Sequence, residues 1–311
     1  MKVTAKERRF PSATGLCDIR CRIWIPEEPL AAVQITHGMA EHIDRYEDFA
    51  IFLAENGVLV YGMDNASHGR SIAPDGVRGY FGKANGWDAL IQDMRTLRDL
   101  VKPNYPAIPF ILMGHSMGSF MARAYAARDG GDFDAYIFSG TAGRNNVLPI
   151  AKLLAKREIR KTGGDKPSMT LHKLGVGAYN KAFKNARTPC DWLSRDEAAV
   201  DRYVADEACG FPFTACGMLD LFTGLSEISS AQWAKNVPDR PILVLSGAND
   251  PVGSMGKGVR QVEKWLRETG HSPEIKLYEG GRHEMLNELN RDEVYGDILL
   301  FLNTVEAMGE R

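Results

Sequence analysis

The chain has 311 residues, of which 44% are hydrophobic and 25% charged, a composition typical of a soluble protein with a sizeable core. A formal net charge of -2 argues against a general nucleic-acid binder, and no apolar run is long enough to span a membrane. Segment 1–9 lacks the apolar region of a signal peptide, and five cysteines without close pairing fit a reducing compartment, so we expect a cytoplasmic protein.

Up to about residue 140 the sequence alternates between predicted strands and predicted helices. Short apolar runs between turn residues predict strands, whereas apolar residues at helical spacing predict amphipathic helices. The predicted strands are 3–10, 16–25, 31–36, 58–63, about 109–115 and 135–138. The predicted helices are about 45–55, about 86–102 and the segment that follows residue 116. The first two strands are joined by a turn at 12–15, which predicts an antiparallel hairpin.

The strand pattern stops after residue 140 and returns at residue 241. The intervening stretch has helical patterns at 147–161 and 213–229. The last part of the chain has predicted strands at 241–246 and 274–278, and predicted helices near 258–269 and from about 292. Strands that alternate with helices predict an α/β fold with a mostly parallel, doubly wound sheet. We expect a core made of residues 1–140 and 237–311, with a helical cap, residues 141–236, inserted between its two parts.

One segment, Gly114-His115-Ser116-Met117-Gly118, lies between a predicted strand and a predicted helix. A serine in such a sharp turn needs a strained backbone, and flanking glycines keep side chains out of the close strand–helix crossing. The serine hydroxyl is then exposed at the positive N-terminal end of the helix. We predict that Ser116 is a nucleophile; the alternative is a glycine-rich turn with an incidental serine.

A serine nucleophile needs a base that removes its proton. The base must come from a loop at the carboxyl end of the sheet, where Ser116 also lies. Among seven histidines, His283 fits this position, because it follows the last predicted strand and precedes the last predicted helix. The alternative for His283 is an ordinary surface-loop histidine.

The imidazole in turn needs a carboxylate that fixes its tautomer and stabilises its charged form. Asp250 follows strand 241–246 at the same edge of the sheet, although an Asn-Asp-Pro loop can also be purely structural. Asp220 and Glu284 are the other candidates. The order Ser116, Asp250, His283 is the order expected of α/β-hydrolases.

The reaction also needs two backbone N–H groups that stabilise an oxyanion. Met117 directly follows the predicted nucleophile and is expected to supply one of them. The turn His37-Gly38-Met39 after the third strand is expected to supply the other, from Met39.

Four motifs together resemble the monoacylglycerol lipase and lysophospholipase group of α/β-hydrolases, which are serine aminopeptidase S33-like hydrolases. They are His-Gly-Met-Ala-Glu-His at 37–42, Gly-His-Ser-Met-Gly at 114–118, Asn-Asp-Pro at 249–251 and Gly-Arg-His-Glu at 281–284. Segment 68–71 also resembles the His-Gly-x-Ser loop of this group, where a structural role is expected. The resemblance implies hydrolysis of carboxylic esters through an acyl-enzyme, with no metal and no organic cofactor.

Apolar residues near both ends of the predicted cap are candidates for an acyl-chain tunnel, and packing of the cap on the sheet is the alternative. They are Val147, Leu148, Ile150, Leu153, Leu154, Phe211, Phe213, Met218, Leu219, Leu221, Phe222 and Leu225. An aminopeptidase of the same fold would instead need cap carboxylates that hold a substrate amine. The candidates are Asp196, Glu197, Asp201, Asp206 and Glu207. A small-ester carboxylesterase and a non-catalytic binding protein are further alternatives.

Charge is divided unevenly within the predicted cap. Between Arg144 and Arg187 eleven basic residues accompany only two acids, Glu158 and Asp165, and the rest of the cap is acidic. Helix 147–161 carries both apolar and basic residues, a pattern typical of helices that lie in a lipid interface. We therefore expect transient contact of the cap with an anionic membrane surface, with a solvated lid as the alternative.

Overall fold

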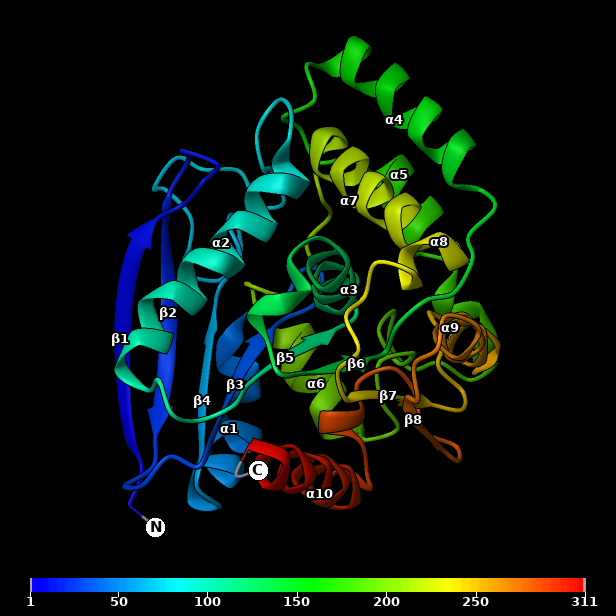
Figure 1. Ribbon diagram of the computed structural model, residues 1–311. Helices are drawn as coiled ribbons and strands as arrows, with labels where there is room; N and C mark the ends of the chain where they lie inside the picture. The colour runs from blue at the N-terminus through cyan, green and yellow to red at the C-terminus, as the bar shows by residue number, and fades with distance from the viewer. Residues whose placement is uncertain (1, 310–311) are drawn as a thin grey trace.

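The computed structural model describes residues 2–309 and contains one eight-stranded sheet (Figure 1). The strands are β1 (Thr4–Pro11), β2 (Asp18–Ile25), β3 (Ala31–Thr36), β4 (Val58–Met63), β5 (Phe110–His115), β6 (Ala135–Ser139), β7 (Ile242–Gly247) and β8 (Glu274–Tyr278). Their order in the sheet is β1-β2-β4-β3-β5-β6-β7-β8. β2 pairs antiparallel with β1 and with β4, and every other neighbouring pair is parallel, so most strands end at the same edge.

Five helices cover the two faces of the sheet. They are α1 (Glu47–Glu55), α2 (Gly86–Val101), α3 (Met117–Asp129), α9 (Lys257–Glu268) and α10 (Arg291–Gly309). In β5, Phe110 and Leu112 pack into the core shared with α2, α3 and α9, whereas Ile111 and Met113 pack into the core shared with α1 and α10. Successive strand residues point to opposite faces, so covering both faces requires the continuous apolar runs seen in the sequence.

The chain between β6 and β7 contributes helices and loops but no strand to the sheet. The helices are α4 (Leu148–Thr162), α5 (Met169–Gly175), α6 (Glu197–Ala205), α7 (Ala215–Ile228) and α8 (Ala231–Ala234). Figure 1 shows α4 as the outermost helix at one end of the molecule, with α7 packed between α4 and α3. Within residues 2–309, no helix combines the length and the apolar character needed to cross a membrane.

Short 3-10 helices complete the described chain. They are η1 (Ile43–Tyr46), η2 (Lys102–Asn104), η3 (Gly130–Asp132), η4 (Tyr179–Ala182) and η5 (Met285–Asn287).

Part of the insertion lies against the loop that follows β8. The Glu284 N–H donates to the Leu193 carbonyl at 2.7 Å, and the Arg195 guanidinium lies 2.9 Å from the Glu288 carboxylate. The boundaries 1–140, 141–236 and 237–311 therefore stay a prediction, because residues 193–195 of the insertion bind directly to the loop after β8.

Arg123 in α3 connects both ends of the insertion to the core. Its guanidinium is fully buried and donates hydrogen bonds to the carbonyls of Ala142 at 2.7 Å and Ile228 at 2.8 Å. It also lies 4.1 Å from the ring centre of Trp233. Burial lowers the pKa of Arg123 to about 9, which still leaves it charged at neutral pH.

The predicted strands and long helices are all present, with ends that differ by at most two residues. The mostly parallel α/β sheet is therefore confirmed. The sequence does not predict α5, α6 and α8, because segments of seven, nine and four residues are too short for a clear helical period.

Candidate active site

Ser116 occupies the turn between β5 and α3, with φ 53° and ψ -121°. Such a backbone costs about 1–3 kcal/mol and persists only where the surrounding structure enforces it. Here glycines permit the close crossing: a Cβ on Gly114 would collide with the Gly118 backbone, and one on Gly118 with the Thr36 carbonyl. The half-buried Ser116 side chain lines a cavity at the carboxyl edge of the sheet.

His283 and Asp250 follow β8 and β7, and they meet at this edge. Nδ1 of His283 lies 2.9 Å from Oδ2 of Asp250, and both side chains are buried. Asp250 also accepts hydrogen bonds from the Ser246 hydroxyl at 2.9 Å and the Val252 N–H at 2.8 Å. Because the carboxylate accepts from Nδ1, Nε2 of His283 is the free basic nitrogen.

The two buried groups shift each other's pKa. Burial alone would lower the pKa of His283, but the Asp250 charge and hydrogen bond outweigh burial and raise this pKa above its usual value. Burial would raise the pKa of Asp250, but His283 and the hydrogen bonds keep it below its usual value. The Asp250 carboxylate therefore stabilises the imidazolium that forms when Nε2 of His283 takes up a proton.

Two aromatic rings lie against the imidazole of His283. The His115 ring centre lies 4.7 Å away and the Trp192 ring centre 5.0 Å away. Burial lowers the pKa of His115 to about 4, so this second histidine is neutral at physiological pH. His115 and Trp192 both line the cavity, and His115 adds an uncharged ring surface to its wall.

The loop after β3 is fixed from both sides. The Gly38 N–H donates to Oε1 of Glu41 at 2.5 Å, and the Asn65 N–H donates to Nε2 of His37 at 2.9 Å. Burial lowers the pKa of His37, which keeps the ring neutral, as that second hydrogen bond requires. The loop therefore has little freedom to move next to Ser116.

The two residues predicted to bind an oxyanion, Met39 and Met117, both line the cavity. Met117 is the first residue of α3, and a helix leaves its first N–H groups without intrahelical partners. Within the described chain, the Met39 N–H donates to no protein acceptor. Both N–H groups are therefore available to a bound molecule.

A buried ionic network, not predicted from the sequence, joins this loop to the His283 loop. The Arg45 guanidinium binds Glu41 and forms two hydrogen bonds with Glu284, at 2.8 and 2.6 Å. Burial would raise the pKa of Glu41, but Arg45 lowers it to about 2. Glu41 belongs to the His-Gly-x-x-Glu-His motif, whereas nothing in the sequence pairs Arg45 with a residue 239 positions away.

The cavity has a volume of about 460 Å³ and a mostly apolar wall. Residues of the insertion that line it include Val147, Leu148, Leu174, Leu221, Phe222 and Leu225. A few polar side chains, among them Glu41, Tyr203 and Asn180, interrupt this wall. An apolar cavity with few polar groups is typical of a site for a small, partly apolar ligand.

Several predicted candidates lie elsewhere. Ile150, Leu153 and Leu154 do not line the cavity; they are 63%, 62% and 42% exposed, so their assignment to a tunnel is wrong. The five cap carboxylates proposed for an amine do not line it either; Asp196, for example, caps α6. The Asp220 carboxylate extends from α7 to the start of α2, where it lies beside the N–H groups of Gly86 and Trp87.

A serine in a strained strand–helix turn, with His283 and Asp250 on later loops of a mostly parallel sheet, defines an α/β-hydrolase. The family model described as serine aminopeptidase, S33, matches residues 27–290, and the chain belongs to this family.

Several known proteins are similar to this chain over most of its length. The monoacylglycerol lipase of Mycolicibacterium smegmatis is 30% identical over 298 residues, or 95% of this chain and 96% of that protein. The human monoglyceride lipase is 28% identical, over 86% of this chain and 80% of that protein. A solved carboxyl esterase from Bacillus coagulans has a TM-score of 0.92 and 32% identity, over 97% of this chain and 99% of that chain. The resemblance predicted from the motifs is confirmed, and the protein is a serine ester hydrolase.

Proposed function

We propose that the protein cleaves esters of lipid-like acids, monoacylglycerols or lysophospholipids, through a covalent acyl-enzyme on Ser116. The observation that carries this proposal is the position of Ser116 and His283 in the wall of one largely apolar cavity, with Asp250 bonded to the imidazole.

In the first half of the reaction, Oγ of Ser116 attacks the ester carbonyl while Nε2 of His283 takes the hydroxyl proton. The negative charge that develops on the carbonyl oxygen is stabilised by the N–H groups of Met39 and Met117. Asp250 keeps Nδ1 of His283 protonated and stabilises the imidazolium. When the tetrahedral intermediate collapses, the ester bond breaks and His283 gives its proton to the leaving alcohol.

In the second half, a water molecule takes the place of the alcohol. His283 removes a proton from this water, and the resulting hydroxide attacks the acyl carbon. The same two N–H groups stabilise the second tetrahedral intermediate. The carboxylic acid then leaves and Ser116 regains its proton from His283, so the reaction needs no redox step or group-transfer cofactor.

The cavity wall supports an apolar acyl group. Leu148, Leu221, Phe222 and Leu225 provide apolar surface from α4 and α7, and burying apolar surface contributes about 25 cal/mol per Å². The relatives named monoacylglycerol lipase agree with this substrate class. An aminopeptidase is the second candidate because of the family description. It is less favoured, because the carboxylates that line the cavity, Glu41 and Glu284, are already bound to Arg45.

A substrate panel with a covalent probe tests the proposal. A medium-chain monoacylglycerol, a lysophospholipid, a short-chain ester and an aminoacyl-anilide are compared at equal concentration, and a fluorophosphonate is used to label the nucleophile. We expect label on Ser116 and the highest kcat/KM for one of the two lipid esters. Preference for the anilide would favour the aminopeptidase, preference for the short ester a general carboxylesterase, and absence of label a non-catalytic protein.

We further propose that α4 contacts anionic membranes and brings substrate to the cavity. Its buried residues Leu148, Ala151 and Ala155 lie on one side of the helix, whereas Ile150, Leu153 and Leu154 are exposed. The exposed apolar residues occupy the first two turns, and basic residues are concentrated in the rest of the helix. Apolar side chains that enter the lipid, together with basic residues that each contribute about 1 kcal/mol near anionic headgroups, give reversible binding to an anionic surface.

A further inference from the structure

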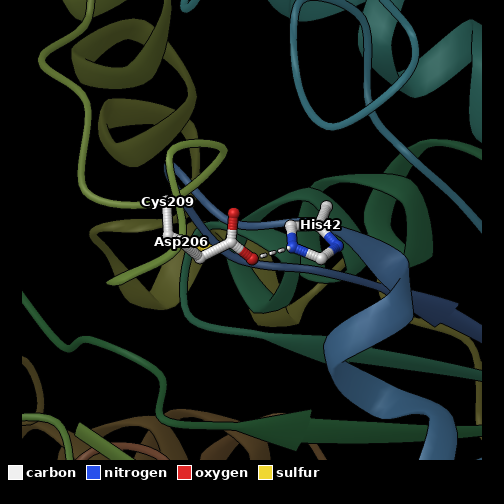
Figure 2. A group of neighbouring side chains, drawn as sticks. All are labelled: His42, Asp206 and Cys209. Atoms are coloured by element: carbon white, nitrogen blue, oxygen red, sulfur yellow. Dashed lines mark hydrogen bonds and ion pairs between the residues drawn. The ribbon is translucent and has the colours of Figure 1, made fainter. Parts of the chain in front are cut away.

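Three side chains with metal-binding atoms meet where the insertion contacts the loop after β3. They are His42, which follows Glu41, and Asp206 and Cys209, which belong to the turn after α6 (Figure 2). One ligand atom from each residue lies within 4.8 Å of the other two, and all three residues are partly buried. His42 and Asp206 are 164 positions apart in the sequence, so only the fold brings them together.

Hydrogen bonds fix the turn that carries two of these groups. The Cys209 N–H donates to the Asp206 carbonyl at 2.9 Å, and the Ala208 N–H donates to Oδ1 of Asp206 at 2.8 Å. These bonds leave Oδ2 of Asp206 facing Nε2 of His42 at a distance of 2.8 Å. The dashed line in Figure 2 marks this contact. The turn is thus preorganised, and one carboxylate oxygen already points at the imidazole.

The same turn is anchored to the loop after β3 by bonds that use none of the three ligand atoms. The Ala40 carbonyl accepts hydrogen bonds from the Gly210 N–H at 2.9 Å and from the Tyr203 hydroxyl at 3.1 Å. Ala40 and Gly210 both line the substrate cavity, whereas the three clustered residues do not. The cluster therefore lies beside the cavity wall but outside it.

Imidazole, carboxylate and thiolate with one open position form a donor set typical of zinc, and the sulfur disfavours magnesium and calcium. Ligand atoms around a tetrahedral zinc ion lie roughly 3.4–3.7 Å apart. To hold an ion, Nε2 of His42 and Oδ2 of Asp206, now 2.8 Å apart, must separate and the more distant atoms must approach, by shifts of about 1 Å. The other charged groups nearby, Arg45, Glu41 and Glu284, form their own ionic network, so the three ligand atoms are not part of it.

We propose that His42, Asp206 and Cys209 bind a thiophilic divalent cation, zinc or cadmium, which bridges the turn after α6 to the loop after β3. On binding, the Cys209 thiol releases its proton to solvent and its sulfur coordinates the ion. The proton that Nε2 of His42 shares with Asp206 moves to Nδ1 through solvent, which frees Nε2 to coordinate the ion beside the Asp206 carboxylate. Water supplies the fourth ligand. Because the thiol must lose its proton before its sulfur coordinates, binding is expected to be weaker at low pH and to release a proton.

Cadmium titration of the purified full-length protein tests this site, because cadmium–thiolate bonds absorb in the ultraviolet. We expect saturation at one cadmium ion per chain, and a rise in melting temperature with either cadmium or zinc. Cys209→Ser should abolish the absorption, and His42→Asn and Asp206→Asn should each weaken binding at least about tenfold. Cys17→Ser, remote from the cluster, is the matched control and should bind as the unmodified protein does.

Melting curves without metal show whether each variant is folded. An absorption signal that survives in Cys209→Ser, or affinities unchanged in both His42→Asn and Asp206→Asn, would overturn the proposal. Absence of saturable binding to the unmodified protein would also overturn it, leaving a hydrogen-bonded cluster. Ser116→Ala is expected to bind the ion normally, so failure of the proposed hydrolysis would not affect this result.

Discussion

The sheet core and the helical insertion differ in how tightly their residues are constrained. In the core, Gly118 has no room for a Cβ beside the Thr36 carbonyl, and Asp250 accepts hydrogen bonds from three groups. In the insertion, Ile150 and Leu153 of α4 are more than half exposed. Under the proposed function, the constrained core would carry the chemistry and the less constrained insertion would control what reaches it.

The largest expected effect separates a core serine from a serine of the insertion. Ser116→Ala should lower kcat by about a millionfold, because the nucleophile is lost. Ser226→Ala, which removes a hydroxyl bonded only within α7 to the Phe222 carbonyl, should leave kcat nearly unchanged. Ester hydrolysis assays, with circular dichroism as a folding check, measure both. Retention of more than a few percent activity by Ser116→Ala would contradict the assigned nucleophile.

A second pair of variants compares two carboxylates. Asp250→Asn should lower kcat about ten-thousandfold, because the amide favours the wrong tautomer of His283. Asp220→Asn changes a carboxylate on α7 that lies at the start of α2, and most activity should remain. Equal losses of kcat in the two variants would contradict the proposal that the core carboxylate, and not the one in the insertion, takes part in the reaction.

The third prediction concerns the pH dependence of the core site. The base must be neutral, and Asp250 raises the pKa of His283 above its usual value. The ratio kcat/KM should therefore fall about tenfold per pH unit below that raised pKa. A pH–rate profile on a substrate without ionisable groups measures this. A flat profile down to about pH 5 would mean that His283 is not the base.

The fourth prediction concerns the surface of the insertion. The double variant Ile150→Ser/Leu153→Ser should bind anionic vesicles at least about tenfold more weakly, because two apolar side chains no longer enter the lipid. Leu300→Ser is the matched control: Leu300 is 61% exposed on α10, far from α4 in Figure 1. Hydrolysis of a water-soluble ester should be unchanged in both.

Co-sedimentation with and without anionic lipid, at low and high salt, measures this binding. Binding should require the anionic lipid and weaken with salt. Equal binding of the unmodified protein to neutral vesicles, or binding to neither, would leave α4 as a solvated lid.

The smallest expected effect is on the stability of the core. Asp93 in α2 is fully buried, accepts hydrogen bonds from Ser12 and Ala13, and has a pKa raised by burial to about 6. A raised pKa means that its contribution to stability is complete below the unfolded pKa and is lost as pH rises through about 6. Between about pH 5 and 7 this loss is of the order of 1 kcal/mol. Denaturant unfolding of Asp93→Asn should show a smaller pH dependence, and an unchanged dependence would exclude this carboxyl as its source.

The sequence predicts the core well because each of its constraints is local. A continuous apolar run identifies a doubly covered strand, and Gly114 and Gly118 mark the serine turn within five residues. The Arg45–Glu284 pair and the His42–Asp206–Cys209 cluster depend on contacts between distant segments, which no local pattern reports. On α4, the apolar residues alone could not show which side faces the cavity, because that depends on how α7 packs against it.

Arg123 has a consequence for motion. Its guanidinium donates a part-buried hydrogen bond to Ala142, near the start of the insertion, and a buried one to Ile228, near its end. Breaking a hydrogen bond to a charged group costs about 1.5–3 kcal/mol, so a displacement of either carbonyl is opposed by that much. A movement of the distal helices that leaves both carbonyls in place keeps these two bonds intact. Both bonds come from α3, the helix that begins directly after Ser116, so such a movement would leave the backbone that positions Ser116 undisturbed.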